Sequence, residues 1–169
     1  MRAVIFLAVF LLSGCGYKSA AHYARSVVGE RISTEVVTSM EDPQNTVLIK
    51  DAVDMAVITK FRSSLVPKSE SQTHLKIAIA SVTFTPLRYD TNGYVIAYRT
   101  TVLLHIDRFS KEGKNFGYDT RGLYDFVIEA NAIITDQARF EAIRQGAAKG
   151  IDAFIARVAA EGANMQREE

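Results

Sequence analysis

The sequence contains one cysteine, no tryptophan, three prolines and ten glycines in 169 residues. With Cys15 as the only thiol, an intramolecular disulfide and a cysteine-based metal cluster are both excluded. Basic and acidic side chains almost cancel, at 20 and 19 respectively. A basic excess that would favour nucleic acid is therefore missing, and so is an acidic tail. We expect a domain without disulfides that does not bind nucleic acid.

Recognisable catalytic patterns are also missing. The three histidines, His22, His74 and His105, are not spaced as pairs of metal ligands. The sequence has no G-x-S-x-G, phosphate-loop or G-x-G-x-x-G motif. Asp51 and Asp54 fall on the polar side of an expected helix, where solvated charge is the simpler interpretation. We therefore predict a protein that is not an enzyme, with no catalytic residues, metal or cofactor.

The N-terminus carries an export signal. Met1-Arg2 is followed by an apolar run over residues 3–12 and then by Leu12-Ser13-Gly14-Cys15. This order is typical of a secretory signal peptide, here residues 1–14, with lipid attachment at Cys15 as in bacterial lipoproteins. The run is too short to span a bilayer, which needs about 20 residues. The alternative is a secreted protein, or a short anchor, with a chance cysteine.

The mature chain is long enough for one domain. Gly16 after the cysteine, in place of aspartate, favours the outer membrane. We expect a lipidated tether over residues 15–30, a single domain over 31–161, and a flexible tail over 162–169.

Hydrophobic periodicity predicts an α+β fold. Alternation favours strands at 31–38, 73–85, 94–109 and 116–129, and apolar stripes at helical spacing favour helices at 47–61 and 135–161. The β-α-β-β-β-α order predicts a four-stranded mixed sheet with two helices packed on one face.

The turns predict the strand register. A two-residue Asn92-Gly93 loop would pair Ile79 with Ile106 and Thr83 with Val102. The next strand joins the same face if its loop, centred near Gly113, has an odd number of residues. The predicted core comprises Ile79, Tyr98, Val102, Leu104, Tyr124 and Phe126 beneath Leu48, Ala52, Phe140, Ile143, Ile151 and Phe154.

The opposite sheet face is unusually apolar for a solvated surface. It is expected to carry Ala80, Val82, Phe84, Arg88, Val95, Ala97, Arg99, Leu103, Arg121, Leu123 and Val127, with His105 opposite Arg121. Apolar patches rimmed by polar groups often bind a partner or ligand. Alternatively, the N-terminal tether covers this face, or the face simply tolerates alanine and valine.

The sequence resembles the LptE family of outer-membrane lipoproteins. The resemblance rests on Cys15-Gly16-Tyr17, on Asp42-Pro43 before the first helix, on Asn92-Gly93 followed by Ala97-Tyr98, and on the order of elements. It implies a non-catalytic protein that plugs the β-barrel LptD, helps to assemble it, and receives lipopolysaccharide.

The family's basic lipopolysaccharide contacts do not transfer directly to this chain. Thr91 precedes the Asn-Gly turn, and Ile133 and Ile134 stand where a second basic residue is expected. The chain's own Arg88, Arg99 and Arg121 are therefore the candidates for the lipid A phosphates. Two alternative functions remain: a lipoprotein regulator of a periplasmic peptidoglycan synthase, and an auxiliary lipoprotein of a lipid-trafficking ABC transporter.

Overall fold

The computed structural model describes residues 20–37 and 43–168. The predicted signal peptide (residues 1–14) and Cys15 therefore lie outside the described residues, and the Asp42-Pro43 junction lies partly outside them. The elements are α2 (Ala20–Val28), β1 (Arg31–Val36), α3 (Pro43–Ala56), the π-helical turn η1 (Val57–Phe61), β2 (Ser64–Leu65), the 3-10 turn η2 (Lys68–Glu70), β3 (Thr73–Tyr89), β4 (Val95–Ser110), β5 (Asn115–Val127) and α4 (Asp136–Glu168).

One mixed sheet organises the domain, in the order β2-β1-β3-β4-β5. β1 runs parallel to both β2 and β3, whereas β3, β4 and β5 form an antiparallel meander. The α+β class and the mixed sheet are as predicted, but the sheet has five strands and not four. The additional strand, β2, has only two residues, too few for a period-two pattern to reveal it.

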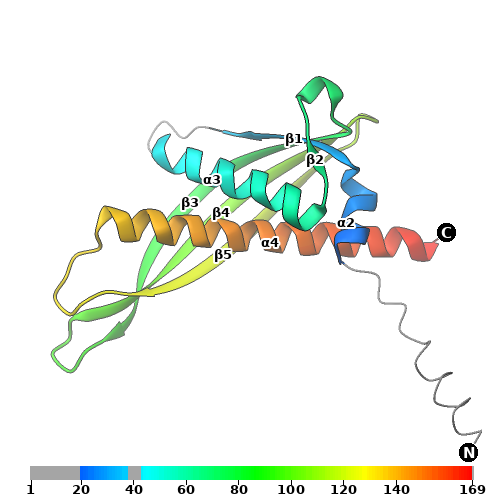
Figure 1. The fold of residues 1–169 in the computed structure, drawn as a ribbon. Helices are drawn as coiled ribbons and strands as arrows, with labels where there is room; N and C mark the ends of the chain where they lie inside the picture. The colour runs from blue at the N-terminus through cyan, green and yellow to red at the C-terminus, as the bar shows by residue number, and fades with distance from the viewer. Residues whose placement is uncertain (1–19, 38–42, 169) are drawn as a thin grey trace, which may run out of the picture.

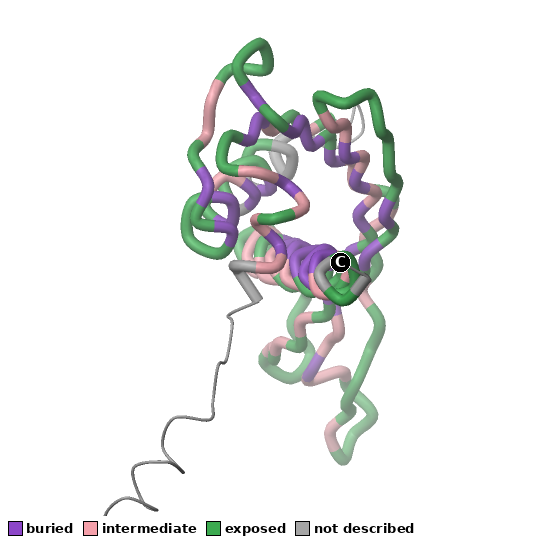
Figure 2. Tube along the Cα trace, turned by 90° about the vertical axis from the view of Figure 1, so that its right-hand side faces the viewer, coloured by how far each residue is buried: buried purple, intermediate pink, exposed green. Residues whose placement is uncertain are grey.

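The helices cover one face of this sheet (Figure 1). α3 and α4 pack on the strands, and α2 packs against α4. In Figure 2 the buried positions, drawn in purple, occur both on the helices and on the strands. Their apolar cluster includes Ile32, Ile49, Leu75, Leu104, Ile106 and Phe154. Among the described residues, no helix has the length and apolar character needed to cross a membrane.

The predicted core is buried over its central part. Val102, Leu104, Ile143, Ile151 and Phe154 are buried. Ile79, Tyr98, Tyr124, Phe126 and Phe140 are only partly buried. The β3–β4 hairpin extends beyond the helices (Figure 1), so fewer side chains cover the strands toward that end. The side chains of Leu48 and Ala52 lie outside the described set.

The first hairpin, between β3 and β4, has a different register from the predicted one. Its loop has three residues, 91–93, because the Asp90 carboxylate accepts hydrogen bonds from the backbone N–H groups of Asn92 and Tyr94, at 2.9 and 2.8 Å. Further from the loop, the pairing of β3 with β4 shifts by one residue between Ile79 and Ser81. Ile79 consequently pairs with Leu104, and the predicted pairings of Ile79 with Ile106 and of Thr83 with Val102 are wrong.

This bulge also changes which side chains face outward. Beyond it, Val82 pairs with Val102 and Phe84 with Thr100, both of which are core-facing positions of β4. Val82 and Phe84 therefore pack against the core and do not belong to the outward face as predicted. The apolar part of that face is correspondingly smaller.

The second hairpin has the predicted parity. The Ser110 N–H donates to Lys114 O at 2.9 Å, which leaves an odd, three-residue loop over 111–113. The loop is centred one residue before Gly113, so His105 pairs with Asp119 and not with Arg121. The faces of β5 are nevertheless correct, because the displacement is an even number of residues.

The folded domain extends beyond both predicted boundaries. Residues 20–28, expected within the tether, form α2, in which Ala24 and Val28 are fully buried. At the other end, α4 continues to Glu168 in place of the expected tail. α2 and the C-terminal part of α4 pack together: a Cβ on Gly162 would lie only 2.2 Å from the Tyr23 carbonyl oxygen.

Candidate functional site

Arg99 on the outward face is held by a carboxylate on the neighbouring strand. It pairs directly with Asp125 across β4 and β5. Its Nε donates to Asp125 Oδ1 and its Nη2 to Oδ2, both at 2.7 Å. This fork-to-fork contact raises the pKa of Arg99 and lowers that of Asp125. The pair uses two of the five guanidinium N–H donors and places a carboxylate against the charge. Arg99 therefore joins two strands, and a phosphate would have to compete with Asp125 for it.

The other two candidate arginines have no such partner. Arg121 and Arg88 are exposed, and neither forms an ion pair or side-chain hydrogen bond with the described residues. They are not neighbours. Arg121 pairs with Leu103, whereas Arg88 pairs with Ala97, six positions away on β4. At about 3.3 Å per residue, roughly 20 Å separates the two backbone positions. The three candidate arginines therefore provide two separate unpaired guanidinium groups and not a cluster of three.

Apolar side chains surround Arg121 on this face. Leu103, directly opposite, is 38% exposed, and Leu123, two residues further along β5, is 41% exposed. The β3–β4 turn and the connection from β5 to α4 lie at the end of the molecule opposite to α2 (Figure 1), and large apolar side chains in and beside these segments are exposed. These are Leu87, Tyr89, Tyr94, Val127 and Ile133. Sequence reasoning placed the two leucines and Val127 on the outward face but missed the rest of this terminal group, because the group depends on how far the strands extend past the helices.

His105, which also lies on the outward face, makes a second polar contact between β4 and β5. Its Nδ1 lies 2.6 Å from Asp119 Oδ1, and its Nε2 lies 3.2 Å from Asp107 Oδ1. The hydrogen bond with Asp119 and the nearby Asp107 charge raise the pKa of His105. Within the described residues, no three His, Cys, Asp or Glu side chains are grouped to hold a metal ion. This contact links β4 to β5 on the surface of the sheet, and it is ionic when His105 is protonated.

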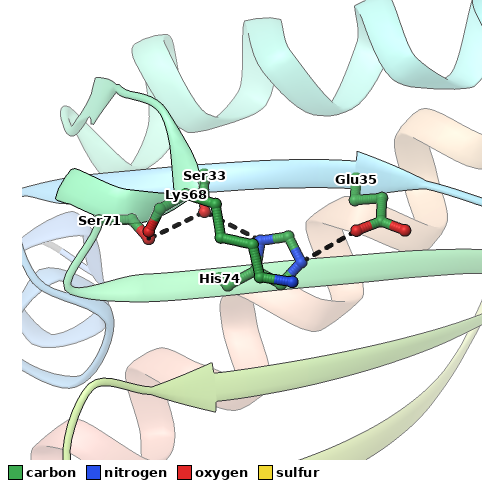
Figure 3. Close-up of polar contacts among 5 residues, drawn as sticks. All are labelled: Ser33, Glu35, Lys68, Ser71 and His74. Carbon is green, nitrogen blue, oxygen red and sulfur yellow. Dashed lines mark hydrogen bonds and ion pairs between the residues drawn. The ribbon is translucent and has the colours of Figure 1, made fainter.

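A buried polar network lies between β1, β3 and the loop before β3 (Figure 3). His74 Nδ1 lies 2.9 Å from Ser33 Oγ, and Nε2 lies 3.2 Å from Glu35 Oε2. Ser33 Oγ also contacts Ser71 Oγ at 2.9 Å, and Ser71 donates to the Lys68 carbonyl oxygen.

Serine, histidine and glutamate in a row resemble a nucleophilic relay. Here, however, Ser33, Ser71 and His74 are all buried, and the hydrogen bonds link the strands to the loop that contains Lys68. We interpret the network as the contact that holds this loop on β1 and β3.

The two histidines should affect stability with opposite dependence on pH. Burial, followed by the charge of Lys68, lowers the pKa of His74 below 6.5. The unfolded chain then binds the proton more readily, so His74 should reduce the free energy of unfolding as pH falls through 6.5. His105, with a raised pKa, should add stability at low pH that is lost as pH rises through its folded-state pKa.

Urea unfolding from about pH 5 to about pH 8 tests this assignment. In His74→Gln, the loss of stability on acidification should be smaller than in the wild type. In His105→Asn, that loss should be larger. Slopes parallel to the wild type in both variants would contradict the assignment, and comparing slopes removes the constant cost of each substitution.

Comparisons with known proteins identify a matching family and solved structures with a similar fold. A family model described as LptE, lipopolysaccharide-assembly, matches residues 34–158. No curated protein matches the chain in sequence. An uncharacterized lipoprotein B from Nitrosomonas europaea is similar in structure, with a TM-score of 0.54 and 15% identity over 88% of this chain and 94% of that one.

Two further solved structures are similar. A putative lipoprotein from Caulobacter crescentus has a TM-score of 0.54 and 12% identity, covering 86% of this chain and 98% of its own. A protein from Xanthomonas campestris has a TM-score of 0.51 and 8% identity, covering 82% and 87% respectively. At these identities the likeness shows a shared fold, with a sheet and helices arranged as in this chain.

Proposed function

Because this chain belongs to the LptE family of lipopolysaccharide-assembly proteins, we propose that it is an outer-membrane lipoprotein anchored through Cys15. In this proposal it plugs and helps to assemble an LptD-like β-barrel, and it binds lipopolysaccharide during transport to the outer leaflet. The family match over residues 34–158 carries the proposal. It favours this function over the synthase regulator and the transporter subunit.

The outward sheet face supports the proposed ligand through its chemistry. Lipid A combines phosphates with acyl chains. The planar, permanently charged guanidinium suits a phosphate, and exposed leucines suit an acyl chain. Arg121 has no partner among the described residues, and it lies between Leu103 and Leu123. We therefore assign the phosphate contacts to Arg121 and Arg88, and we assign Arg99 the role of joining β4 to β5.

Charge reversal separates this assignment from a general effect of charge. Arg88→Glu with Arg121→Glu should weaken binding of the signal-less protein to purified lipopolysaccharide by roughly tenfold or more, because charge-assisted contacts are lost. Lys111→Glu with Lys149→Glu makes the same change in net charge at exposed positions outside the face. That control should bind nearly as the wild type does.

Two results would alter the proposal. Unchanged affinity in a folded Arg88/Arg121 variant, with circular dichroism as the folding control, would remove these arginines from the site. A variant that still binds lipopolysaccharide but no longer associates with the barrel would show that this face docks on the barrel wall instead.

A further inference from the structure

The polar network around His74 lies on the outward side of the sheet, beneath the η2 loop (residues 66–72). Ser33 and His74 pair across β1 and β3, and their chain neighbours Ile32 and Leu75 belong to the core. Because side chains alternate along a strand, Ser33 and His74 point away from the core. They are nevertheless only 6% and 7% exposed. The η2 loop contacts them through a serine hydroxyl (Figure 3) and covers this part of the face.

The hydrogens available to the network fix the direction of each contact. A carbonyl oxygen can only accept, so the Ser71 hydroxyl gives its single hydrogen to the Lys68 carbonyl oxygen, 2.9 Å away. The contact between Ser33 Oγ and Ser71 Oγ must then be donated by Ser33. Ser33 has no hydrogen left for His74, so Nδ1 of the ring has to donate to Ser33 Oγ. On the other side of the ring, Nε2 faces the Glu35 carboxylate, which also accepts.

The complete network therefore requires hydrogen on both ring nitrogens, which only a protonated histidine has. A neutral ring must lose one contact. With its hydrogen on Nδ1, the ring turns a lone pair toward Glu35 and loses that hydrogen bond. With its hydrogen on Nε2, the ring keeps the Glu35 contact and the hydroxyl chain reverses. Ser71 then donates to Ser33, Ser33 donates to Nδ1, and the Lys68 carbonyl loses the hydroxyl.

The second neutral arrangement is the more favourable one. It keeps the charge-assisted hydrogen bond to Glu35, which is roughly twice as strong as a bond between neutral groups. The bond that it loses is a neutral one, and the Lys68 carbonyl oxygen still accepts from the Ser71 N–H, at 3.4 Å. The neutral ring should therefore carry its hydrogen on Nε2.

We propose that Ser33, Ser71 and His74 form a pH-sensitive switch on the η2 loop. Protonation of His74 reverses the hydroxyl chain and ties the loop through the hydrogen bond from the Ser71 hydroxyl to the Lys68 carbonyl, and deprotonation releases that bond. The switch is a device of the fold itself, so it does not depend on the proposed function.

The surroundings of His74 set the pH range in which the switch operates. Burial opposes the protonated ring most strongly, and the charges of Lys68 on η2 and Lys76 on β3 also oppose it. Glu35 on β1 favours it. β4 contributes the uncharged ring of Phe109, with the two ring centroids 6.0 Å apart. The net effect lowers the pKa of His74 below 6.5, so the neutral arrangement holds at neutral pH and the switch operates on acidification.

The position of the ring hydrogen tests the proposal on the wild-type protein. In the ¹⁵N-labelled, signal-less chain, long-range ¹H–¹⁵N spectra distinguish a protonated ring nitrogen from a bare one, and comparison with His74→Gln identifies the signals. Above its titration, His74 should carry hydrogen on Nε2 only, and below its titration on both nitrogens. A neutral ring with hydrogen on Nδ1 would contradict the proposal.

Ser71→Ala measures the coupling between the ring and the loop. The Ser71 hydroxyl makes one hydrogen bond in the neutral network and two in the protonated network, so its removal should lower the pKa of His74 relative to the wild type. Ser71→Thr keeps a hydroxyl and should restore the wild-type titration. Ser63→Ala is the matched control, because it removes a buried hydroxyl that donates to the Gly29 carbonyl, outside the network.

The result that would overturn the proposal is the same titration of His74 in Ser71→Ala and in Ser63→Ala. With hydrogen on Nδ1 in the neutral ring, the hydroxyl chain would keep one direction at every pH. Ser71 would then make the same hydrogen bonds in both states, and its removal would not change the titration.

Discussion

Gly122→Ala should destabilise the protein by about 3 kcal/mol or more, at the upper end of the range for an overpacked interface. The added Cβ would lie 1.8 Å from the Gly146 carbonyl oxygen and 2.5 Å from Gly150 N. Both are backbone atoms of α4, so no side-chain rotation can relieve the clash. α4 would have to move away from β5 and take its buried stripe with it, including Ile151 and Phe154. Urea or thermal unfolding measures the loss.

Gly117→Ala on the same strand is the control for this prediction. Its Cβ would meet the His105 ring and Asp107 Oδ1, all at ordinary van der Waals distances, so its stability should change by less than about 1 kcal/mol. A Gly122→Ala protein as stable as the Gly117→Ala protein would contradict the close packing of α4 on β5.

Cys15→Ser should abolish membrane anchoring. Lipid attachment needs the thiol, and cleavage of a lipoprotein signal follows lipidation, so the variant should accumulate as an unlipidated precursor. Each buried methylene of an attached acyl chain contributes about 0.8 kcal/mol to membrane binding, and all of this is lost at once. Metabolic labelling with a tagged fatty acid should show a labelled wild type and an unlabelled variant.

The sequence itself supplies the control for this experiment. Cys15 is the only cysteine, so no second thiol can take the label. Gly14→Ala keeps a small residue before the cysteine and should be labelled as the wild type is. Equal labelling of the wild type and Cys15→Ser would overturn the lipid-attachment assignment.

The hydrophobic periodicity of this chain was enough to predict the long elements of the fold. The helices α3 and α4 and the strands β3, β4 and β5 lie where the apolar spacing places them, because each buries one face in a shared core. Parity also placed Tyr118, Tyr124 and Phe126 on the core-facing side of β5. The short strand β2 and helix α2 were missed. A two-residue strand has no period, and α2 is defined by its packing against α4.

The outward face was harder to predict, because it depends on register. The Asp90 carboxylate enlarges the first loop to three residues, and the bulge after Ile79 turns Val82 and Phe84 inward. Neither feature changes the hydrophobic pattern that a sequence displays. The Arg99–Asp125 ion pair was missed for a related reason. A loop displaced by one residue moves every cross-strand partner by two, so the same arginine appeared free in the predicted register.

Co-isolation of the native, lipidated chain tests the central claim most directly. The protein should be crosslinked in intact cells, extracted from the outer-membrane fraction, and analysed for bound protein and bound lipopolysaccharide. Assembly with a lipopolysaccharide-exporting barrel predicts one large β-barrel protein in near-equal amount, with lipopolysaccharide in the same complex. Recovery of a peptidoglycan synthase or an inner-membrane ATPase in place of that barrel would contradict the account.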